Sequence, residues 1–190
     1  MNSLRLIIST VLSFLPVVVV FGAGAVGQDR PKQPSGELRF KAPSEWVVEK
    51  PSSSMRLAQY KLPKAEGDSE DASLVLYFFG ENQGGSVQAN LERWVSQFEQ
   101  SDGSSSSAKA KLETITVNNL KVATIDLAGT YVAETAPGSG VRHKNPDYRL
   151  RAAVIETPKG AHYVKLVGPS KTVNRWEKAF NEYLQSFEFK

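Results

Sequence analysis

The amino-acid sequence predicts an α+β fold, in which a central, mostly antiparallel sheet of about six to seven strands carries one helix on each face. Short apolar segments follow one another through turns that are too tight for crossover connections, which favours antiparallel pairing. Two amphipathic stretches, centred on Trp94 and Trp176, have matching apolar stripes and are typical of helices that cover a sheet. The segment 74–79 is apolar on both faces, which indicates a central strand covered from both sides and therefore an α/β/α sandwich.

An N-terminal secretory signal peptide is predicted from three consecutive features. Arg5 supplies a positive charge, residues 6–21 form an apolar run, and Ala23-Gly24-Ala25 resembles a signal-peptidase site. An uncleaved membrane anchor is disfavoured, because Pro16 interrupts the run, which is also shorter than the roughly 20 residues needed to span a bilayer. We therefore expect residues 1–25 to be removed.

After cleavage, the mature chain is expected to begin at or near Val26. Residues 26–36 mix Gln, Pro, Lys and Ser without periodicity and are interpreted as a flexible leader. A single α+β domain is expected over residues 37–190. The expected location is periplasmic or secreted, and after cleavage the chain is not expected to be an integral membrane protein.

Composition excludes several classes of function. The chain has no cysteine, which excludes disulfides, zinc–thiolate sites and thiol nucleophiles. A formal net charge of +3 is spread over 23 basic and 20 acidic residues, so the chain lacks the strongly basic character of nucleic-acid-binding proteins. No nucleic-acid partner is therefore expected.

The first half of the domain is expected to contain four strands followed by a helix. The acidic stretch 64–72 lacks the spacing of an EF-hand calcium loop and is interpreted as a solvated loop. Ser86 is a suitable helix cap, and apolar residues recur at helical spacing as far as Phe98. The serines at 104–107 are expected to form a mobile loop. The predicted strands are 38–43, 46–48, 55–62 and 74–79, and the predicted helix is 87–98.

The second half is predicted to be a run of strands closed by one helix. Asn118-Asn119 and the segment 157–160 are hairpin signals, and Ser170 can cap a final helix. Trp94 and Trp176 are expected to be largely buried, because each lies at the centre of a helix stripe that faces the sheet. The predicted strands are 111–117, 120–133, 148–156 and 161–167, and the predicted helix is 170–187.

This order of strands, helix, strands and terminal helix resembles the PsbP-like superfamily. Two short motifs carry the resemblance, Phe40-Lys41-Ala42-Pro43-Ser44-Glu45-Trp46 at the start of the domain and Ser186-Phe187-Glu188-Phe189 at its end. The superfamily contains an extrinsic photosystem II subunit, a Ran-binding nuclear-import factor and bacterial exported proteins. The resemblance implies a sheet with helices on both faces and a non-enzymatic binding or assembly role, and it offers no shared catalytic motif to transfer.

Motifs for catalysis are incomplete or missing in the sequence. Gly80–Ser86 lacks the lysine of a phosphate-binding loop, and neither a Gly-x-Ser-x-Gly elbow nor a His-Glu-x-x-His helix occurs. His162 shares a strand face with Val164 and Leu166, which favours a partly buried structural histidine over a catalytic one. No catalytic residue, cofactor or metal site is therefore predicted.

Arg142, His143 and Lys144 are the candidate binding residues. They form a basic cluster in a predicted loop from Glu134 to Asp147, which is long for a compact domain. The cluster would attract an acidic partner or anionic headgroups, and protonation of His143 below a pH of about 6.5 would strengthen that attraction. An ordinary solvated loop remains the alternative.

Three functional hypotheses follow. The leading one is an exported, non-catalytic domain that binds a protein or another envelope component, and it is favoured by the signal peptide and the missing catalytic motifs. The second is a hydrolase or other enzyme that uses His143 together with a carboxylate such as Asp147. The third is a carrier that holds a small ligand in a cleft between the sheet and a helix.

Overall fold

The computed structural model describes residues 36–190 of the chain. The predicted signal peptide, the cleavage before Val26 and all but the last residue of the predicted leader lie outside the described residues. Within residues 36–190, no helix is long and apolar enough to cross a membrane.

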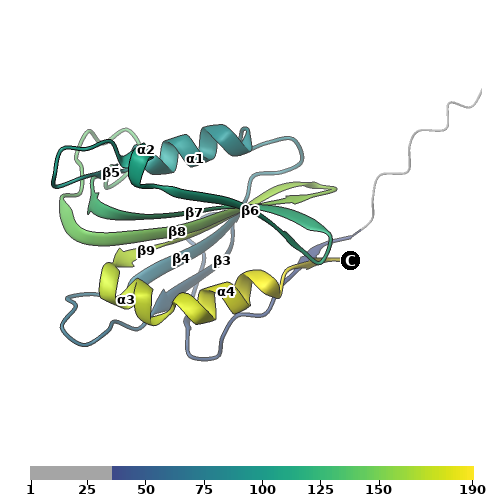
Figure 1. Cartoon of the computed structure of the whole chain (residues 1–190). Helices are drawn as coiled ribbons and strands as arrows, with labels where there is room; N and C mark the ends of the chain where they lie inside the picture. The colour runs from purple at the N-terminus through teal and green to yellow at the C-terminus, as the bar shows by residue number, and fades with distance from the viewer. Residues whose placement is uncertain (1–35) are drawn as a thin grey trace, which may run out of the picture. The chain divides into compact units, whose positions relative to one another are not determined.

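An eight-stranded antiparallel sheet forms the centre of the domain, with helices on both faces (Figure 1). Helices α1 and α2 lie on one face, and α3 and α4 lie on the other. The predicted α+β class and layer order are therefore confirmed. The strands are β1 Leu38–Arg39, β2 Val47–Glu49, β3 Arg56–Leu62, β4 Ala72–Phe78, β5 Phe98–Glu99, β6 Lys111–Val117, β7 Leu120–Tyr131, β8 Asn145–Thr157, β9 Gly160–Pro169 and β10 Glu188–Phe189. The helices are α1 Val87–Val95, α2 Ser106–Lys109, α3 Ser170–Arg175 and α4 Glu177–Gln185.

The strand order in the main sheet is β2-β3-β4-β9-β8-β7-β5, and β6 pairs with β7 beside β5. Every described pair is antiparallel, as expected for a chain connected by hairpins. The two-residue strands β1 and β10 pair separately and bring the start and the end of the domain together. The sheet has more strands than predicted, because β5 pairs along only two residues and carries no alternating pattern of its own.

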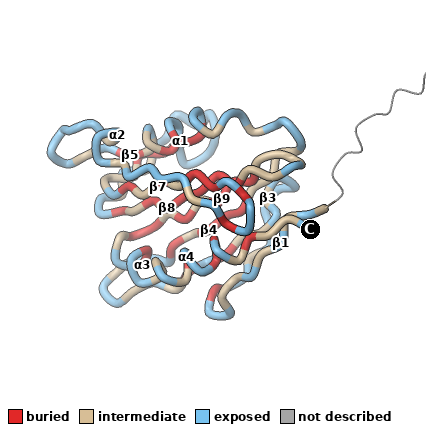
Figure 2. The backbone as a smooth tube through the Cα atoms, turned by 45° about the vertical axis from the view of Figure 1, so that its right-hand side comes forward, coloured by how far each residue is buried: buried red, intermediate tan, exposed pale blue. Residues whose placement is uncertain are grey.

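Strand β4 is apolar on both sides because both of its faces are covered. Leu74 and Leu76 belong to the core beneath α4, whereas Val75 points to the α1 face. Buried residues are concentrated along the central strands (Figure 2). The prediction of a doubly covered central strand is thus confirmed.

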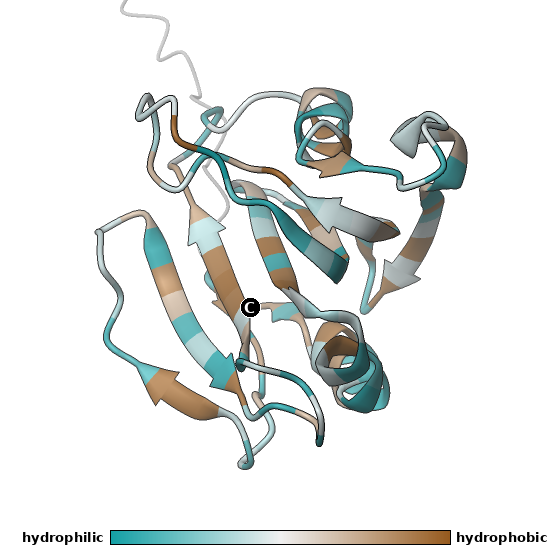
Figure 3. Ribbon diagram, turned by 90° about the vertical axis from the view of Figure 1, so that its left-hand side faces the viewer, coloured by the Kyte–Doolittle hydropathy of each residue, from teal (hydrophilic) through white to brown (hydrophobic). Residues whose placement is uncertain are grey.

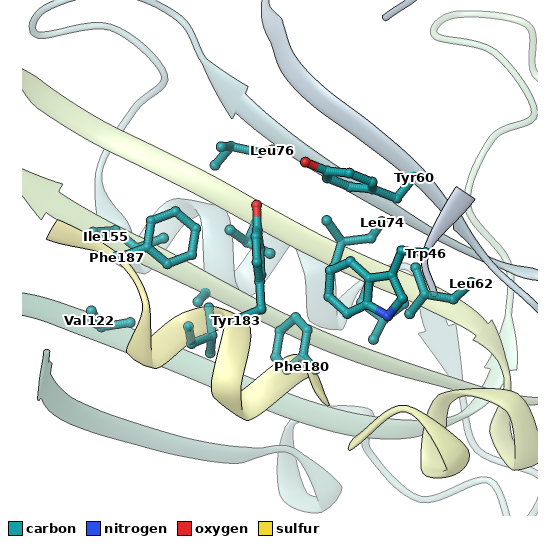
Figure 4. Close-up of a cluster of buried hydrophobic side chains, with 14 of the residues drawn as sticks. Trp46, Tyr60, Leu62, Leu74, Leu76, Val122, Ile155, Phe180, Tyr183 and Phe187 are labelled. Atoms are coloured by element: carbon teal, nitrogen blue, oxygen red, sulfur yellow. The ribbon is translucent and has the colours of Figure 1, made fainter. Parts of the chain in front are cut away.

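The core beneath α4 is a cluster of aromatic and aliphatic side chains (Figure 4). Tyr183 from α4 makes edge contacts with Trp46, Tyr60 and Phe187, with ring centroids 5.2, 6.4 and 4.9 Å away, respectively. Edge-to-face rings add directional attraction to the apolar burial. This cluster fastens the C-terminal helix to the sheet, and the polar side of α4 faces outward (Figure 3).

The final helix is not continuous, contrary to the prediction. It is divided at Trp176, whose backbone leaves helical geometry at φ −95° and ψ 5°. The Trp176 indole Nε1–H donates to the Pro63 carbonyl oxygen at 2.8 Å, so the ring lies half-buried at the edge of the core. The expectation that Trp176 is largely buried is therefore wrong, since the break turns its ring toward the 63–64 segment.

The first long helix begins as predicted but ends early. The Ser86 Oγ accepts from the Ala89 N–H at 3.1 Å, which confirms the cap, but α1 ends at Val95. Phe98 belongs instead to β5, where it is buried beside Tyr131. Part of the serine stretch 104–107 is also ordered, because α2 begins at Ser106.

Candidate binding site beside helix α1

A half-buried lysine lies on the sheet face that α1 covers. Lys165 lies on the same face of β9 as Tyr163 and Val167, which both pack in the core beneath α1. Its Nζ donates to the Gln97 Oε1 at 2.6 Å and to the Tyr131 hydroxyl at 3.2 Å. Burial, and next the positive charge of Arg93, lower the pKa of Lys165 from 10.5 to about 8.

Arg93, an exposed residue of α1, is near enough to Lys165 for its positive charge to act on the lysine. It lies in the last turn of α1, and its Nη2 donates to the Asn90 Oδ1 at 2.5 Å. Asn90 is 2% exposed, and its Nδ2 donates to the Gly84 and Ser86 carbonyl oxygens at 2.8 and 2.9 Å. The start of α1 therefore holds Asn90 in place, and Asn90 in turn orients the Arg93 guanidinium.

Aromatic rings line the same sheet face beneath α1. Tyr77 stacks on Phe79 with centroids 5.9 Å apart, and Phe79 packs against Tyr163. Gly84 has a φ of +90°, and a Cβ placed there would lie 2.6 Å from the Tyr163 hydroxyl. Only glycine permits this close approach, which brings the loop before α1 down onto the aromatic rings.

Tyr131 joins this cluster to the basic loop predicted from the sequence. The Tyr131 ring lies 5.2 Å from the Lys165 Nζ, and its centroid is 5.3 Å from that of the His143 ring. Tyr131 also stacks on Tyr148 with centroids 5.9 Å apart. The Tyr148 hydroxyl donates to the Glu70 carboxylate, which together with burial raises the pKa of Tyr148 to about 12. We call Arg93, Lys165, Tyr77, Tyr131 and His143 the cation–aromatic site.

Arg142 and Lys144, the other two residues predicted from the sequence, flank His143 in the chain but do not belong to this site. The Arg142 Nε donates to the Val132 carbonyl oxygen at 2.7 Å, so this arginine helps to hold the loop. Lys144 is exposed. The loop carries an acidic group as well, because Glu134 Oε2 accepts from the Gly138 N–H at 2.7 Å.

The loop itself is shorter than predicted. Strand β8 starts at Asn145, so the last residues of the predicted loop belong to the sheet. Residues Glu134 and Arg142 form an isolated β-bridge, and the His143 N–H donates to the Ala133 carbonyl oxygen at 2.8 Å. A hairpin extension of β7 and β8 therefore presents the three basic residues.

His162 is more fully buried than the partly buried position predicted for it. It is 5% exposed, and its ring stacks on Phe78 with centroids 4.4 Å apart. Burial lowers its pKa from 6.5 to about 4, so it stays neutral at physiological pH. Its side chain lies on the α4 face, away from Lys165.

A second charged cluster lies on the α4 face and was missed by the sequence reasoning. The Arg149 Nε and Nη2 donate to both oxygens of Asp126 at 2.8 and 2.5 Å, and its Nη1 donates to Glu177 at 3.0 Å. Arg151 lies 3.3 Å from Glu177 and borders a cavity of about 330 Å³ between β6 and α4. One feature of the sequence could have revealed this cluster. Asp126 is a charged residue on the inward face of β7, which it shares with buried Val122.

This cavity is a cleft of the kind expected for a small-ligand carrier. Its two most enclosed carboxylates, however, already have counter-charges, because Asp126 and Glu177 are both paired with arginines. Among residues 36–190, no group of three or more His, Asp or Glu side chains is arranged to hold a metal ion. The cation–aromatic site is therefore the stronger candidate for binding.

Comparisons with known proteins report similar folds without close relatives. No protein-family model matches the chain, and no curated protein sequence matches it. One similar structure is LpqN of Mycobacterium tuberculosis, involved in cell envelope biogenesis, with 9% identity, a TM-score of 0.49 and coverage of 84% of this chain and 87% of that one.

The fold is also similar to that of a cyanobacterial PsbP. The PsbP of Synechocystis is 13% identical, with a TM-score of 0.45 and coverage of 80% of this chain and 86% of that one. A Pseudomonas aeruginosa protein of unknown function, described as a putative regulator, is 16% identical, with a TM-score of 0.45 and coverage of 75% and 95%. A PsbP structure is thus among the structures that this chain is similar to.

Replacing Lys165 with methionine is expected to flatten the pH dependence of stability between about pH 8 and 10. Because the pKa of Lys165 is lowered to about 8 in the folded protein, the unfolded chain binds more protons in this interval. The free energy of unfolding of the native protein should therefore rise with pH there. Urea denaturation at several pH values measures this slope.

Lys121→Met is the matched control for that measurement, since the Lys121 side chain is 65% exposed. The control variant should keep the rise with pH that the native protein shows. An equal rise in Lys165→Met would contradict a desolvated lysine at this position.

Proposed function

We propose that this chain is an exported, non-catalytic binding domain whose partner, a protein or another envelope component, presents an acidic group to the cation–aromatic site. The observation that carries the proposal is the pair of cations Lys165 and Arg93, which form no ion pair with any of residues 36–190. Lys165 is half-buried, and a positive charge that is partly removed from water is costly unless a counter-charge approaches it; Arg93 is exposed and adds positive charge beside it. An acidic partner supplies that charge.

The surroundings of His143 support binding rather than catalysis. Its ring lies against Tyr131 and, among the described residues, makes no hydrogen bond with a carboxylate that would orient it as a general base. Asp147, the carboxylate considered with it, belongs to β8. The signal peptide predicted from the sequence supports an exported location.

Replacing Arg142, His143 and Lys144 together with serine is expected to abolish most partner capture while leaving the fold intact. Loss of the Arg142 hydrogen bond to Val132 should cost about 1 kcal/mol, which corresponds to a fall in Tm of about 2–4 °C. Cross-linking in the native envelope, followed by mass spectrometry, measures capture. A calorimetric melt measures Tm.

The matched control removes two exposed lysines elsewhere, with Lys121 and Lys178 replaced by serine, because the loop variant also loses two formal positive charges when histidine is counted as neutral. This variant has the same net charge as the loop variant and should capture the partner normally. Equal losses in both variants would show that net charge alone is responsible. Recovery of no specific partner by the native chain would contradict the proposed binding role.

A further inference from the structure

The cation–aromatic site has hydrogen-bond donors that no residue of the described chain satisfies. An ammonium group has three N–H donors, and the two acceptors of Lys165 within the described chain, Gln97 and the Tyr131 hydroxyl, are both neutral. Arg93 uses Nη2 on Asn90, which leaves most of its guanidinium fork free. The charged group that acts on Lys165 is Arg93, which has the same sign.

Two phenols add neutral donors beside the cations. The Tyr131 hydroxyl accepts from Lys165, so its own proton is free to be donated. Tyr77 lies close enough to influence the ionisation of Tyr131, and burial raises the pKa of both groups. Both phenols therefore remain protonated donors near neutral pH.

The acidic groups around the site are engaged elsewhere. Glu70 accepts from Tyr148, Glu92 accepts from Gln88 on the outer side of α1, and Glu49 is paired with Lys61. The site thus combines two cations and two phenols without a negative charge of its own. The Arg149–Asp126 cluster on the other face differs in this respect, since its arginines already have carboxylate partners.

We propose that Lys165 and Arg93 together bind the oxyanion group of an acidic ligand, a carboxylate or a phosphate ester, with Tyr77 and Tyr131 donating to the same group. Charge-assisted hydrogen bonds of this kind are among the strongest in proteins. The stacked rings of Tyr77 and Phe79 form an apolar border, so the part of the ligand next to the oxyanion is flat or apolar. The inference rests on the proposed binding role, because it names the chemical group that the site recognises.

Calorimetric titration of the purified chain with three probes tests the inference. Benzoate carries a carboxylate, phenyl phosphate carries a phosphate ester, and benzamide is the uncharged control of similar shape. We expect binding of benzoate, of phenyl phosphate or of both, and none of benzamide. Preference for benzoate identifies a carboxylate source such as an acidic peptide, whereas preference for phenyl phosphate identifies a phosphorylated ligand or headgroup.

Variants locate the binding. Lys165→Met and Arg93→Gln should each weaken the affinity by about tenfold or more, whereas Lys121→Met should leave it unchanged. Lys165→Arg keeps the charge and should retain part of the affinity, so it separates lost charge from lost folding. Equal binding of benzamide, no binding of any probe, or unchanged affinity in both Lys165→Met and Arg93→Gln overturns the inference.

The outcomes also separate this inference from the proposed function. If no probe binds but the loop variant still loses partner capture, the oxyanion site is wrong and the binding role stands. If the probes bind through Lys165 and Arg93 but no macromolecular partner is captured, the oxyanion site stands and the macromolecular role is wrong.

Discussion

Replacing Trp94 with alanine is expected to lower the free energy of unfolding by about 3–5 kcal/mol, a large part of the stability of a typical domain. Trp94 is 4% exposed and lies in the core beneath α1, together with Leu91 and Phe98. Its removal leaves a cavity that the rigid sheet cannot fill, and it detaches the helix that carries Arg93. Urea denaturation followed by circular dichroism measures the loss.

Trp176→Ala is the matched comparison. The Trp176 ring is only half-buried, so alanine should remove mainly edge packing and the hydrogen bond to the Pro63 carbonyl oxygen. The loss should be clearly smaller than that of Trp94→Ala. Equal losses would contradict the difference in burial between the two helices.

Replacing Asp126 with alanine is expected to cost about 3 kcal/mol, because Arg149 would keep its charge in a partly buried place without its main partner. The Arg149 side chain is 15% exposed, and both of its hydrogen bonds to Asp126 would be lost. The double variant Asp126→Ala with Arg149→Ala should lose less than the sum of the two single variants. Urea denaturation of the three variants provides this cycle, and simple additivity would contradict a direct pair.

Acid should weaken the same cluster. Hydrogen bonding with Arg149 lowers the pKa of Glu177 from its ordinary value of 4.5. A carboxyl group of this kind contributes its full stabilisation above 4.5 and loses it as the pH falls through its lowered value in the folded state. Because Glu177 is close to half exposed, solvent screening keeps this contribution small.

Local patterns in the sequence were sufficient for the elements on which the fold depends. The positive φ values of Asn118 and Asn119 confirm the two-residue hairpin signal between β6 and β7. Ser86 caps α1 as predicted, because a serine oxygen satisfies a free N–H whatever packs above the helix. The doubly apolar strand β4 predicted helices on both faces, since a strand of this kind is stable only when both sides are covered.

The candidate site was only partly visible in the same patterns. Arg142, His143 and Lys144 stand out because they are adjacent in the chain, and His143 does belong to the cation–aromatic site, where its ring lies against that of Tyr131. Lys165 gave no such signal, because a single lysine in an alternating strand reads as a solvated side chain. Its environment comes from Gln97 and Tyr131, which are distant in sequence and meet it only through the strand order.

The sequence by itself determined the class of the fold, the hairpins, the cap of α1 and the faces of the strands, because each depends on spacing within one segment. Only the tertiary structure decided the break at Trp176, the pairing of Asp126 with Arg149, and the desolvated Lys165 beside Arg93. Each of these depends on which segments pack together, since the cost of burying a charge and the availability of a partner are properties of the surroundings.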